Sequence, residues 1–308
     1  MSTVTGLKGI IPPVITPFRP DGEVDTASLA RLLEHLIAGG VHGVFILGSS
    51  SEIGAMTPDQ REQILETTVS TVNGRVPVYA GIIDMGTRAV IRHAQKAAEY
   101  DVAGLVATPP YYIHPSDDEI VAHFRAINEA VSLPVIAYNI PTNMHSKLEP
   151  KVVGRLAKEG LAVGVKDSGR SDANFRRMVM ATRGVEGFSL LTGSEVTVDF
   201  TIIAGGHGAV PGLGNVDPAG YRALYDALEA GDLASAREKQ ERLVRLGALR
   251  SQAKRKEVGT TAGSIGGYKT ALQLLGVIEH NAMAAPMTPL DDAEAAGVRA
   301  VLEQEGLL

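Results

Sequence analysis

Short apolar segments alternate with longer amphipathic segments over most of this chain. The longer segments, such as residues 26–40 and 87–101, repeat apolar residues at helical spacing. Several of them begin with a side chain that caps helices well, namely Thr57, Ser116 or Ser171. The apolar segments have the composition of strands and lie at residues 9–18, 43–48, 77–82, 104–109, 134–140, 162–168, 188–193 and 208–212. The pattern therefore predicts eight strand–helix units.

This alternation indicates one fold class. Strands that are apolar throughout and alternate with helices are typical of a parallel sheet with both faces covered. Eight such units in about 230 residues predict an α/β fold of the (β/α)8 TIM barrel type. The alternative is an open doubly wound sheet, which usually carries a G-x-G-x-x-G turn after its first strand. Residues 17–25 read PFRPDGEVD and lack that turn, which favours the barrel.

The strand pattern stops near residue 231, and the remainder of the chain has the pattern of helices. Residues 232–257 predict one long helix, and residues 266–276 and 289–306 predict two more. We therefore expect a barrel domain over residues 1–231 and a C-terminal helical appendage over residues 232–308. The basic run AKRKE (253–257) is interpreted as a solvated face of the long helix, with a phosphate or partner site as the alternative.

Composition narrows the function classes. The chain is 44% hydrophobic and 21% charged, which is ordinary for a soluble globular protein, and its net charge of −6 gives no reason to expect nucleic acid or an anionic membrane as partner. The absence of cysteine excludes disulfides and thiolate chemistry and fits a reducing cytoplasm. The N-terminus does not resemble a signal peptide, and no apolar run approaches the roughly 18 to 20 residues of a membrane span. The eight histidines lack metal-binding spacing, so no metal site is expected.

Lys166 is the first candidate for chemistry. In a barrel the active site collects at the C-terminal ends of the strands, and Lys166 ends the apolar run of the sixth predicted strand. Apolar surroundings disfavour the ammonium and lower the pKa of a lysine, and such an amine can attack a carbonyl to form a Schiff base. The alternative is a structural lysine whose ammonium pairs with Asp167 or Glu195.

Two further strand ends carry useful hydroxyl groups. Tyr138 ends the strand before that of Lys166, where it can shuttle the proton that carbinolamine formation and C–C cleavage require; the alternative is a core aromatic residue. Ser49, Ser50 and Ser51 follow the second strand and offer hydroxyl and backbone N–H groups to a carboxylate, with a simple capping turn as the alternative. The surrounding LGSSSEIG does not match the G-x-S-x-G pattern of serine hydrolases.

These motifs together resemble the dihydrodipicolinate synthase/N-acetylneuraminate lyase family of pyruvate-dependent class I aldolases. Its members are (β/α)8 barrels with a helical C-terminal region, and the resemblance covers nearly the whole chain. The most specific feature is Y-N-I-P followed by K-D-S, with 28 positions between Tyr138 and Lys166. GSSSE (48–52), TPPYY (108–112) and GGHGAV (205–210) resemble further motifs of the family.

The resemblance implies roles for the catalytic residues. It makes Lys166 the residue that forms the Schiff base with a 2-oxo acid and Tyr138 the acid–base residue. Ser49 and Ser50 occupy the turn that holds the carboxylate and continues the proton relay. Tyr112 matches a tyrosine that reaches into the active site of a neighbouring subunit.

The resemblance also implies a pocket and an assembly. Gly193 and Val210 match positions that line the pyruvate pocket. The family is commonly tetrameric, as a dimer of dimers, and needs no metal or organic cofactor. We therefore expect a homotetramer. We also expect no cofactor, since the substrate would be held covalently as an imine of Lys166.

Departures from the family motifs bear on the substrate. In dihydrodipicolinate synthases the fifth residue after the catalytic tyrosine is an arginine that helps to bind the carboxylate of the aldehyde substrate. Here that residue is Asn143. Its neutral amide does not replace a guanidinium group, which is charged and binds a carboxylate through two N–H groups. Residues 211–214 read PGLG where sialate lyases carry a hydroxyl residue. Asn143, His145 and Glu195 would present neutral or acidic groups to the distal end of the substrate, which suits hydroxyl groups.

The leading hypothesis is therefore a Schiff-base-forming aldolase or dehydratase that acts on a 2-keto-3-deoxy sugar acid, with pyruvate as product or co-substrate. The second is 4-hydroxy-tetrahydrodipicolinate (dihydrodipicolinate) synthase itself. A phosphate-binding barrel is a third, because residues 206–215 form a glycine-rich segment at the eighth strand. From another class, a non-catalytic barrel would bind a 2-oxo acid without turnover.

Overall fold

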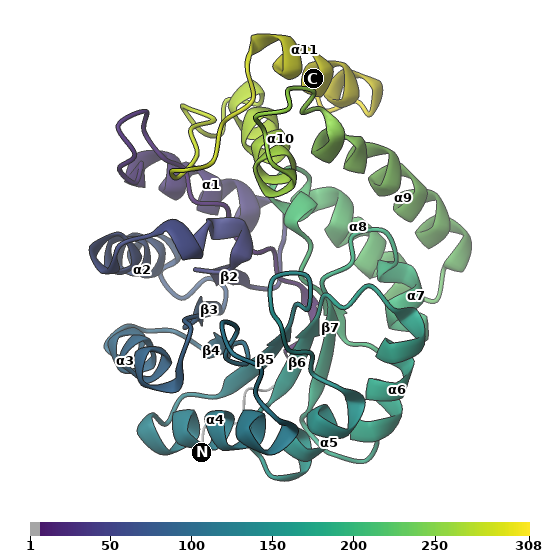
Figure 1. Ribbon diagram of the computed structural model, residues 1–308. Coiled ribbons are helices and arrows are strands. Elements are labelled where there is room, and N and C mark those ends of the chain that lie inside the picture. The colour runs from purple at the N-terminus through teal and green to yellow at the C-terminus, as the bar shows by residue number, and fades with distance from the viewer. Residues whose placement is uncertain (1–6) are drawn as a thin grey trace.

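The computed structural model describes residues 7–308, and in that range eight parallel strands form one curled sheet (Figure 1). Consecutive strands pair from β2 to β8, and β1 pairs with β8. Hydrogen bonds from His42 N to Ile10 O (2.8 Å) and from Phe45 N to Pro12 O (3.0 Å) join the segments of β1 and β2, so the sheet closes. The predicted (β/α)8 barrel is confirmed. The strands are β1 (Gly9–Ile10), β2 (Val44–Ile46), β3 (Val78–Gly81), β4 (Gly104–Ala107), β5 (Val135–Asn139), β6 (Gly164–Asp167), β7 (Ser189–Thr192) and β8 (Gly208–Ala209).

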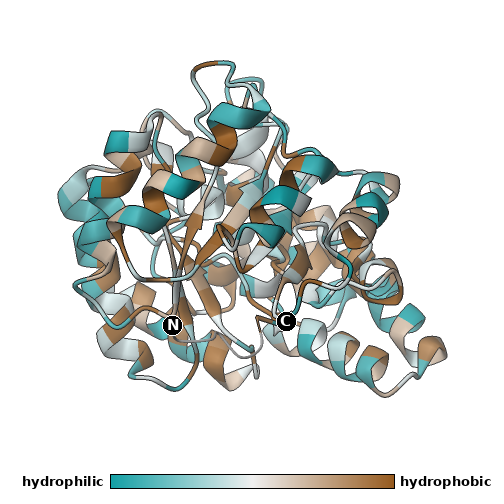
Figure 2. Ribbon diagram, turned by 90° about the horizontal axis from the view of Figure 1, so that it is seen from below, coloured by the Kyte–Doolittle hydropathy of each residue, from teal (hydrophilic) through white to brown (hydrophobic). Residues whose placement is uncertain are grey.

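Helices α1 to α8 follow the strands in turn and surround the barrel (Figure 1). Thr57, Ser116 and Ser171 each accept a hydrogen bond from the backbone N–H three residues on, at 3.2 to 3.3 Å, as their sequence positions predict. Figure 2 shows apolar residues on the strands and polar residues over much of the outer helical surface. The helices are α1 (Thr26–Ala38), α2 (Pro58–Val72), α3 (Thr87–Ala97), α4 (Asp117–Ala130), α5 (Pro150–Lys158), α6 (Asp172–Thr182), α7 (Val198–Ile203) and α8 (Pro218–Glu229).

The first strand is much shorter than residues 9–18, over which the apolar pattern predicts it. Only Gly9–Ile10 pair as a strand, because Pro12, Pro13 and Pro17 have no N–H to donate to a ladder. The segment still runs beside β2, with a hydrogen bond of 2.8 Å from Val14 N to Phe45 O. The prolines therefore shorten the ladder without removing the segment from the barrel wall.

The single long helix predicted over residues 232–257 is wrong. Helix α9 (Leu233–Leu246) ends at Gly247 and continues as the 3₁₀ turn η4 (Gly247–Ser251). This turn buries Leu249 completely, and the close approach of helix α10 leaves no room for a side chain at Gly267, whose Cβ would lie 2.1 Å from Leu249 O. Because glycine is a weak helix former, Gly247 holds the helix only weakly, and the packing of Leu249 then decides where the helix ends.

The basic run 253–257 therefore lies in a connection and not on a helix face. There Arg255 forms an ion pair of 2.9 Å with the buried carboxylate of Glu294 on helix α11 (Asp292–Gln304), so the interpretation as a solvated helix face is wrong. The other two predicted helices are present, as α10 (Thr260–Leu274) and α11.

The C-terminal helices pack on one side of the barrel, where α9 lies next to α8 and α10 packs against η4 and α11 (Figure 1). One continuous apolar core extends from Leu32 in the barrel layer to Leu243 of α9, Leu272 of α10 and Leu302 of α11. The predicted boundary at residue 231 falls in the link between α8 and α9, and the division into two domains remains a prediction. Within residues 7–308 no helix is long and apolar enough to cross a membrane.

Candidate active site

Lys166 and Tyr138 lie side by side at the C-terminal ends of β6 and β5, an end of the barrel called the mouth below. The parallel register pairs the two residues directly, and both are buried. The ammonium nitrogen of Lys166 lies 4.1 Å from the centroid of the Tyr138 ring and 4.9 Å from that of Phe45. Aromatic faces attract a cation without sharing a proton with it. The arrangement therefore holds the amine in place and leaves its reactive atom free.

The structural alternative for Lys166, an ion pair with Asp167 or Glu195, does not hold. Asp167 points its carboxylate toward its neighbour strand, where Oδ1 accepts hydrogen bonds from Asn139 Nδ2 (2.6 Å) and Gly169 N (3.0 Å). Burial raises the pKa of the Asp167 carboxyl, and these hydrogen bonds oppose that effect. Over residues 7–308 no carboxylate forms an ion pair with Lys166.

Glu195 is engaged within the protein. Its carboxylate accepts hydrogen bonds from Leu213 N (2.8 Å) and the Tyr268 hydroxyl (2.8 Å), and it pairs with the guanidinium of Arg250 at 3.0 Å. Burial raises the pKa of Tyr268 well above its usual value, which keeps its hydroxyl protonated as a donor. These contacts argue against the predicted role of Glu195 in binding substrate and indicate that it holds the β7 loop.

The three serines after β2 divide into two kinds. They form the 3₁₀ turn η1 (Ser49–Ser51), in which buried Ser51 donates to Val14 O at 2.6 Å and accepts from Gly48 N at 3.2 Å. Ser51 is thus the capping residue that the structural alternative expected. Ser49 and Ser50 are half-buried, and their hydroxyl groups make no hydrogen bond within the described range. They remain available to a ligand.

Gly193 and Val210 border the lysine as the resemblance predicts. A Cβ atom on Gly193 would lie 3.4 Å from Lys166 Cε and 2.1 Å from Ser168 Oγ, so a glycine preserves the space beside the amine. Val210 is buried with Phe45 and Leu191 around the stem of Lys166 in the barrel interior. These positions support a pocket for a small molecule at the amine.

The loops after β4 and β5 supply the outer part of the mouth. Asn143 and His145 are exposed there, and the rings of His145 and His114 lie 4.8 Å apart, centroid to centroid. Ser146 Oγ joins the two loops through a hydrogen bond of 3.3 Å to Pro110 O. Tyr112 is 76% exposed, so within a single chain it contacts solvent and not the lysine.

Sequence reasoning missed two groups of residues that contact or support the site. Phe45 lies inside a strand and carries no motif, although its ring faces the ammonium of Lys166. Arg250 and Tyr268 come from the C-terminal region and reach Glu195 only through tertiary packing. No local signal distinguishes them from other helical residues.

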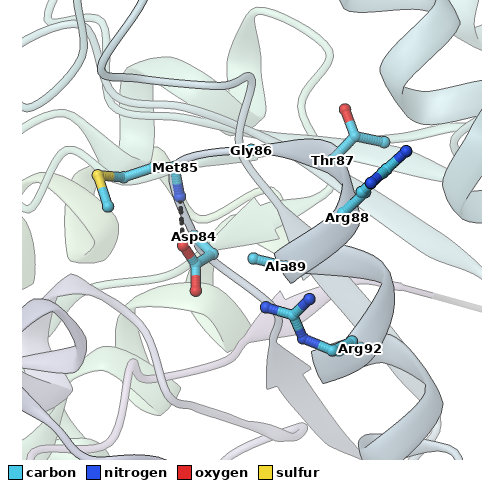
Figure 3. Close-up of a pocket in the computed structure, with 7 residues that line it drawn as sticks. All are labelled: Asp84, Met85, Gly86, Thr87, Arg88, Ala89 and Arg92. Atoms are coloured by element: carbon cyan, nitrogen blue, oxygen red, sulfur yellow. Dashed lines mark hydrogen bonds between the residues drawn. The ribbon is translucent and has the colours of Figure 1, made fainter.

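A separate open hollow lies at the start of α3 (Figure 3) and is not part of this site. Asp84 there accepts a hydrogen bond of 2.6 Å from Met85 N, drawn in Figure 3, and pairs with His93 at 2.9 Å. Thr87, Arg88 and Arg92 also line it. Among residues 7–308 no group of three or more histidine and carboxylate side chains has the arrangement of a metal site.

Comparisons with known proteins agree with this geometry. The model of the dihydrodipicolinate synthetase family matches residues 6–305. The chain is 34% identical to the 4-hydroxy-tetrahydrodipicolinate synthase of Phenylobacterium zucineum (strain HLK1) over 305 residues, or 98% of each protein. YagE, a prophage protein of this family from E. coli K12 solved in complex with pyruvate, superposes with a TM-score of 0.91 at 30% identity, covering 98% of this chain and 99% of YagE. The dihydrodipicolinate synthase of Bacteroides thetaiotaomicron gives a TM-score of 0.91 at 31% identity, covering 97% and 98%.

The chain therefore belongs to the dihydrodipicolinate synthetase family, and the resemblance drawn from its motifs is confirmed. Members of this family are pyruvate-dependent class I aldolases and lyases, and this chain is an enzyme of that class. The family works through a lysine Schiff base and without a metal.

Proposed function

We propose that this enzyme forms an imine between Lys166 and a 2-oxo acid and acts on a 2-keto-3-deoxy sugar acid, either by aldol cleavage or by dehydration. The observation that carries the proposal is the pairing of Lys166 with Tyr138: the amine lies against two aromatic rings, and no carboxylate of residues 7–308 forms an ion pair with it. The 2-oxo group therefore finds a free amine with a phenolic hydroxyl beside it.

The first step is attack of the Lys166 amine on the keto carbon, C2 of the substrate. The carbinolamine then loses its hydroxyl as water, with a proton supplied through Tyr138, and an iminium remains. The hydroxyls of Ser49 and Ser50 donate hydrogen bonds to the carboxylate at C1, because neither has another partner in residues 7–308. The carboxylate is thus held while C2 faces the amine.

The iminium makes the bonds at C3 and C4 labile. In aldol cleavage the C4 hydroxyl loses its proton to Tyr138, the C3–C4 bond breaks, and its electron pair moves to C2–C3 as an enamine while the aldehyde leaves. In dehydration C3 loses a proton instead, and the enamine then expels the C4 hydroxyl as water. In aldol cleavage the enamine first takes up a proton at C3 and becomes the imine of pyruvate. Both routes then end with hydrolysis of the imine, which restores the amine of Lys166.

The sugar-acid substrate is favoured by the outer loops. Asn143 stands where a carboxylate-binding arginine is expected, and His145 lies beside His114 in the adjoining loop. Amide and imidazole groups both donate to and accept from hydroxyl groups, whereas a second carboxylate needs a cation. The distal end of the pocket therefore fits a polyhydroxylated chain better than a carboxylate.

The second candidate is 4-hydroxy-tetrahydrodipicolinate synthase. It is favoured by the names of several relatives at 32 to 34% identity, including the Phenylobacterium enzyme. In that reaction an enamine of pyruvate would attack an aldehyde that carries a carboxylate, and the loss of the arginine at Asn143 weighs against it. The two candidates share the Lys166 imine and differ only in the distal half of the substrate.

We further propose that the enzyme works as a homotetramer, a dimer of dimers. Tyr112 and its neighbour Ile113 are 76% and 57% exposed at the mouth, so both side chains are accessible to a second copy of the chain. A second copy that packs on this loop would cover both residues and receive the Tyr112 hydroxyl in its own site.

The experiment that tests the chemistry is reductive trapping. The protein is incubated with pyruvate and borohydride, digested, and analysed by mass spectrometry, with Lys166→Met as the control. We expect the pyruvate-derived mass on the peptide of Lys166 alone. An unmodified Lys166 in the folded protein, or the adduct on another lysine, would contradict the proposal and leave a binding or phosphate-dependent barrel.

The substrate is tested next with a panel of 2-keto-3-deoxy sugar acids. Release of pyruvate identifies aldol cleavage, and loss of substrate without pyruvate identifies dehydration. Pyruvate consumed only with a carboxylate-bearing aldehyde would instead support the synthase. The variant Asn143→Arg serves as the matched control, because it should lower turnover of the sugar acid and improve use of that aldehyde.

A further inference from the structure

Glu52 and Lys269 form an ion pair that is completely buried, with both side chains 0% exposed. The ammonium of Lys269 also donates to Ala282 O at 2.7 Å and lies 4.5 Å from the centroid of the Phe18 ring, and Glu52 Oε2 accepts from Ala284 N at 2.7 Å. Burying two charges costs desolvation free energy, and a well-packed apolar pair often stabilises a fold as well or better. Stability alone therefore gives little reason for this pair.

The pair is attached to the turn that carries Ser49 and Ser50. Glu52 directly follows this turn, has a left-handed backbone with φ of 63°, and donates its N–H to Ser49 O at 3.1 Å. Ser51 anchors the same turn to the first strand segment through Val14 O. The turn is thus tied on one side to the barrel and on the other to the C-terminal region. The hydroxyls of Ser49 and Ser50 lie between these two anchors, and neither has a hydrogen-bond partner in the part of the chain that the structure describes.

Helix α10 supports the mouth through two consecutive residues. Lys269 binds Glu52 after β2, and Tyr268 binds Glu195 after β7. The two supported loops are close to each other, since a Cβ atom on Gly212 would lie 2.9 Å from Glu195 Oε1 and 3.7 Å from Ser50 Oγ. One turn of a C-terminal helix therefore sets the position of two loops at the mouth of the barrel.

We propose that Glu52 and Lys269 are a positioning pair, which places the hydroxyls of Ser49 and Ser50 where the carboxylate of the 2-oxo acid binds. Lys269 does not act as a second nucleophile, because its side chain has no exposed surface and its ammonium is held by a carboxylate and a carbonyl. The inference rests on the proposed function, in which that turn receives the substrate carboxylate. It makes the C-terminal helix part of the active-site support.

The test is the double variant Glu52→Gln/Lys269→Met, which removes both charges and keeps the side-chain volumes similar. Removal of one partner alone would leave a buried, unpaired charge and destabilise the protein strongly. We expect the pyruvate concentration that half-saturates imine trapping to rise by about 10- to 100-fold, since small displacements of binding groups cost that much. The trapping rate at saturating pyruvate should change far less, because Lys166 and Tyr138 are untouched.

A matched control pair is Arg245→Met/Glu305→Gln. It removes an ion pair of 3.1 Å between α9 and the end of the chain and touches no part of the mouth. This variant should bind pyruvate like the wild type. A Glu52→Gln/Lys269→Met protein that is folded and also binds pyruvate like the wild type would overturn the proposal and leave the pair a purely structural role.

Two further measurements keep the outcomes distinct. If the double variant does not fold, Glu52→Asp replaces it. This variant keeps the negative charge but withdraws the carboxylate by one methylene, so it should also raise the half-saturating pyruvate concentration. Unchanged pyruvate binding would contradict the proposal. A double-mutant cycle combines Glu52→Gln/Lys269→Met with Ser49→Ala/Ser50→Ala. The effects of the two sets of substitutions on pyruvate binding should not add, because both act on the contact between the serine hydroxyls and the carboxylate of the 2-oxo acid. Failure of wild-type trapping would refute the proposed function itself, whereas trapped wild type with an unaffected variant refutes only the positioning role.

Discussion

At the scale of single residues, the sequence spacing of the Y-N-I-P and K-D-S motifs brings Tyr138 and Lys166 into contact. Lys166 follows Tyr138 by 28 positions, an interval that contains α5 and the loop on either side of it, and the parallel register then aligns the two residues on adjacent strands. Because both motifs lie at strand ends, sequence reasoning could place them together. It could not identify Phe45, whose ring completes the surroundings of the ammonium from a third strand.

The glycine beside the amine gives a prediction at this scale. Gly193→Ala places a methyl group 3.4 Å from Lys166 Cε and 2.1 Å from Ser168 Oγ, so Ser168 must move and the space next to the amine shrinks. We expect the half-saturating pyruvate concentration in trapping to rise about 10-fold, with a loss of about 1–3 kcal/mol in unfolding free energy. Saturation trapping and urea unfolding measure these two quantities.

Gly247→Ala is the control for that substitution. Gly247 has helical backbone angles, φ −58° and ψ −14°, and nothing lies within 4 Å of the Cβ that it would gain. This variant should bind pyruvate normally and be as stable as the wild type or more so. Equal effects of the two substitutions would mean that the space at Gly193 has no role in binding.

Glu195 shows that the hydrogen-bond partners of a side chain indicate its role better than its residue type does. Its position after β7 led to the expectation of a substrate contact, and the position at the mouth is correct. Its carboxylate, however, is bound by Arg250, Tyr268 and Leu213 N. A carboxylate with these donors is held in place, and two of the three come from segments more than fifty residues away in the chain.

At the scale of elements, the periodic pattern predicts where helices and strands exist better than where they end. The caps at Thr57, Ser116 and Ser171 depend on neighbours three residues away, and each is present. The first strand is short because its prolines have no N–H to donate, and the end of α9 (Leu233–Leu246) depends on packing around Leu249. The periodic pattern of apolar residues reflects neither the missing N–H groups of the prolines nor the packing around Leu249.

The ion pair that holds α11 to the connection before α10 predicts a pH dependence. Burial alone would raise the pKa of Glu294, but hydrogen bonds from Arg255 and from the backbone N–H groups of Lys254, Arg255 and Asp291 outweigh it and lower that pKa from 4.5 to about 2. A carboxyl with a depressed pKa in the folded state stabilises the protein fully above its unfolded pKa. That contribution is lost as the pH falls from about 4.5 through about 2.

We therefore expect Glu294→Gln to lower the unfolding free energy by about 1.5–3 kcal/mol at pH 7, with a difference from wild type that shrinks below pH 4.5. Chemical denaturation between pH 7 and pH 2.5 measures it. Glu303→Gln, an exposed carboxyl on the same helix, should leave stability nearly unchanged at every pH. A constant difference for Glu294→Gln over the whole range would contradict the assignment.

At the scale of the whole molecule, the C-terminal helices pack on the barrel and contact the loops at its mouth. Their apolar residues join the barrel core, and α10 reaches the mouth through Tyr268 and Lys269. The alignment to the Phenylobacterium enzyme covers 98% of each protein, and YagE superposes with a TM-score of 0.91 over 98% of this chain, so both similarities include the C-terminal region. The proposed assembly would add the last component, since Tyr112 lies exposed at the mouth.

The assembly predicts complementation between two inactive variants. If Tyr112 completes the site of a neighbouring subunit, co-expressed Lys166→Ala and Tyr112→Ala chains form mixed dimers that hold one complete site each. About one quarter of all sites should then be active, because half of randomly formed dimers are mixed. Activity of the co-expressed protein, with the oligomeric state checked by light scattering, measures this.

Lys166→Ala co-expressed with Tyr138→Phe is the control. Both residues belong to the site of a single barrel, so mixed assemblies contain no complete site and should stay inactive. Absence of recovery for the Tyr112 pair in an intact oligomer would show that Tyr112 acts elsewhere.

The sequence by itself determined the barrel and indicated where its chemistry should lie. Strand–helix alternation depends on which residues can be buried at each period, and the short motifs at Tyr138, Lys166 and Ser49–Ser51 lie within single loops or strand ends. Information of this kind is local, so it can be read along the chain. The departure at Asn143 is equally local, and it carries the proposal for the substrate.

Only the tertiary structure decided which polar groups remain free. The hydroxyl of Ser51 is hydrogen-bonded, whereas those of Ser49 and Ser50 have no partner within residues 7–308. The carboxylate of Glu195 is bound by donors of the protein, and Glu52 contacts Ala284 over 232 positions of sequence. Whether a donor or carboxylate can meet a ligand depends on partners that folding brings from distant segments. Burial and hydrogen bonding are properties of the packed molecule, and these two properties separate a support residue from a binding residue.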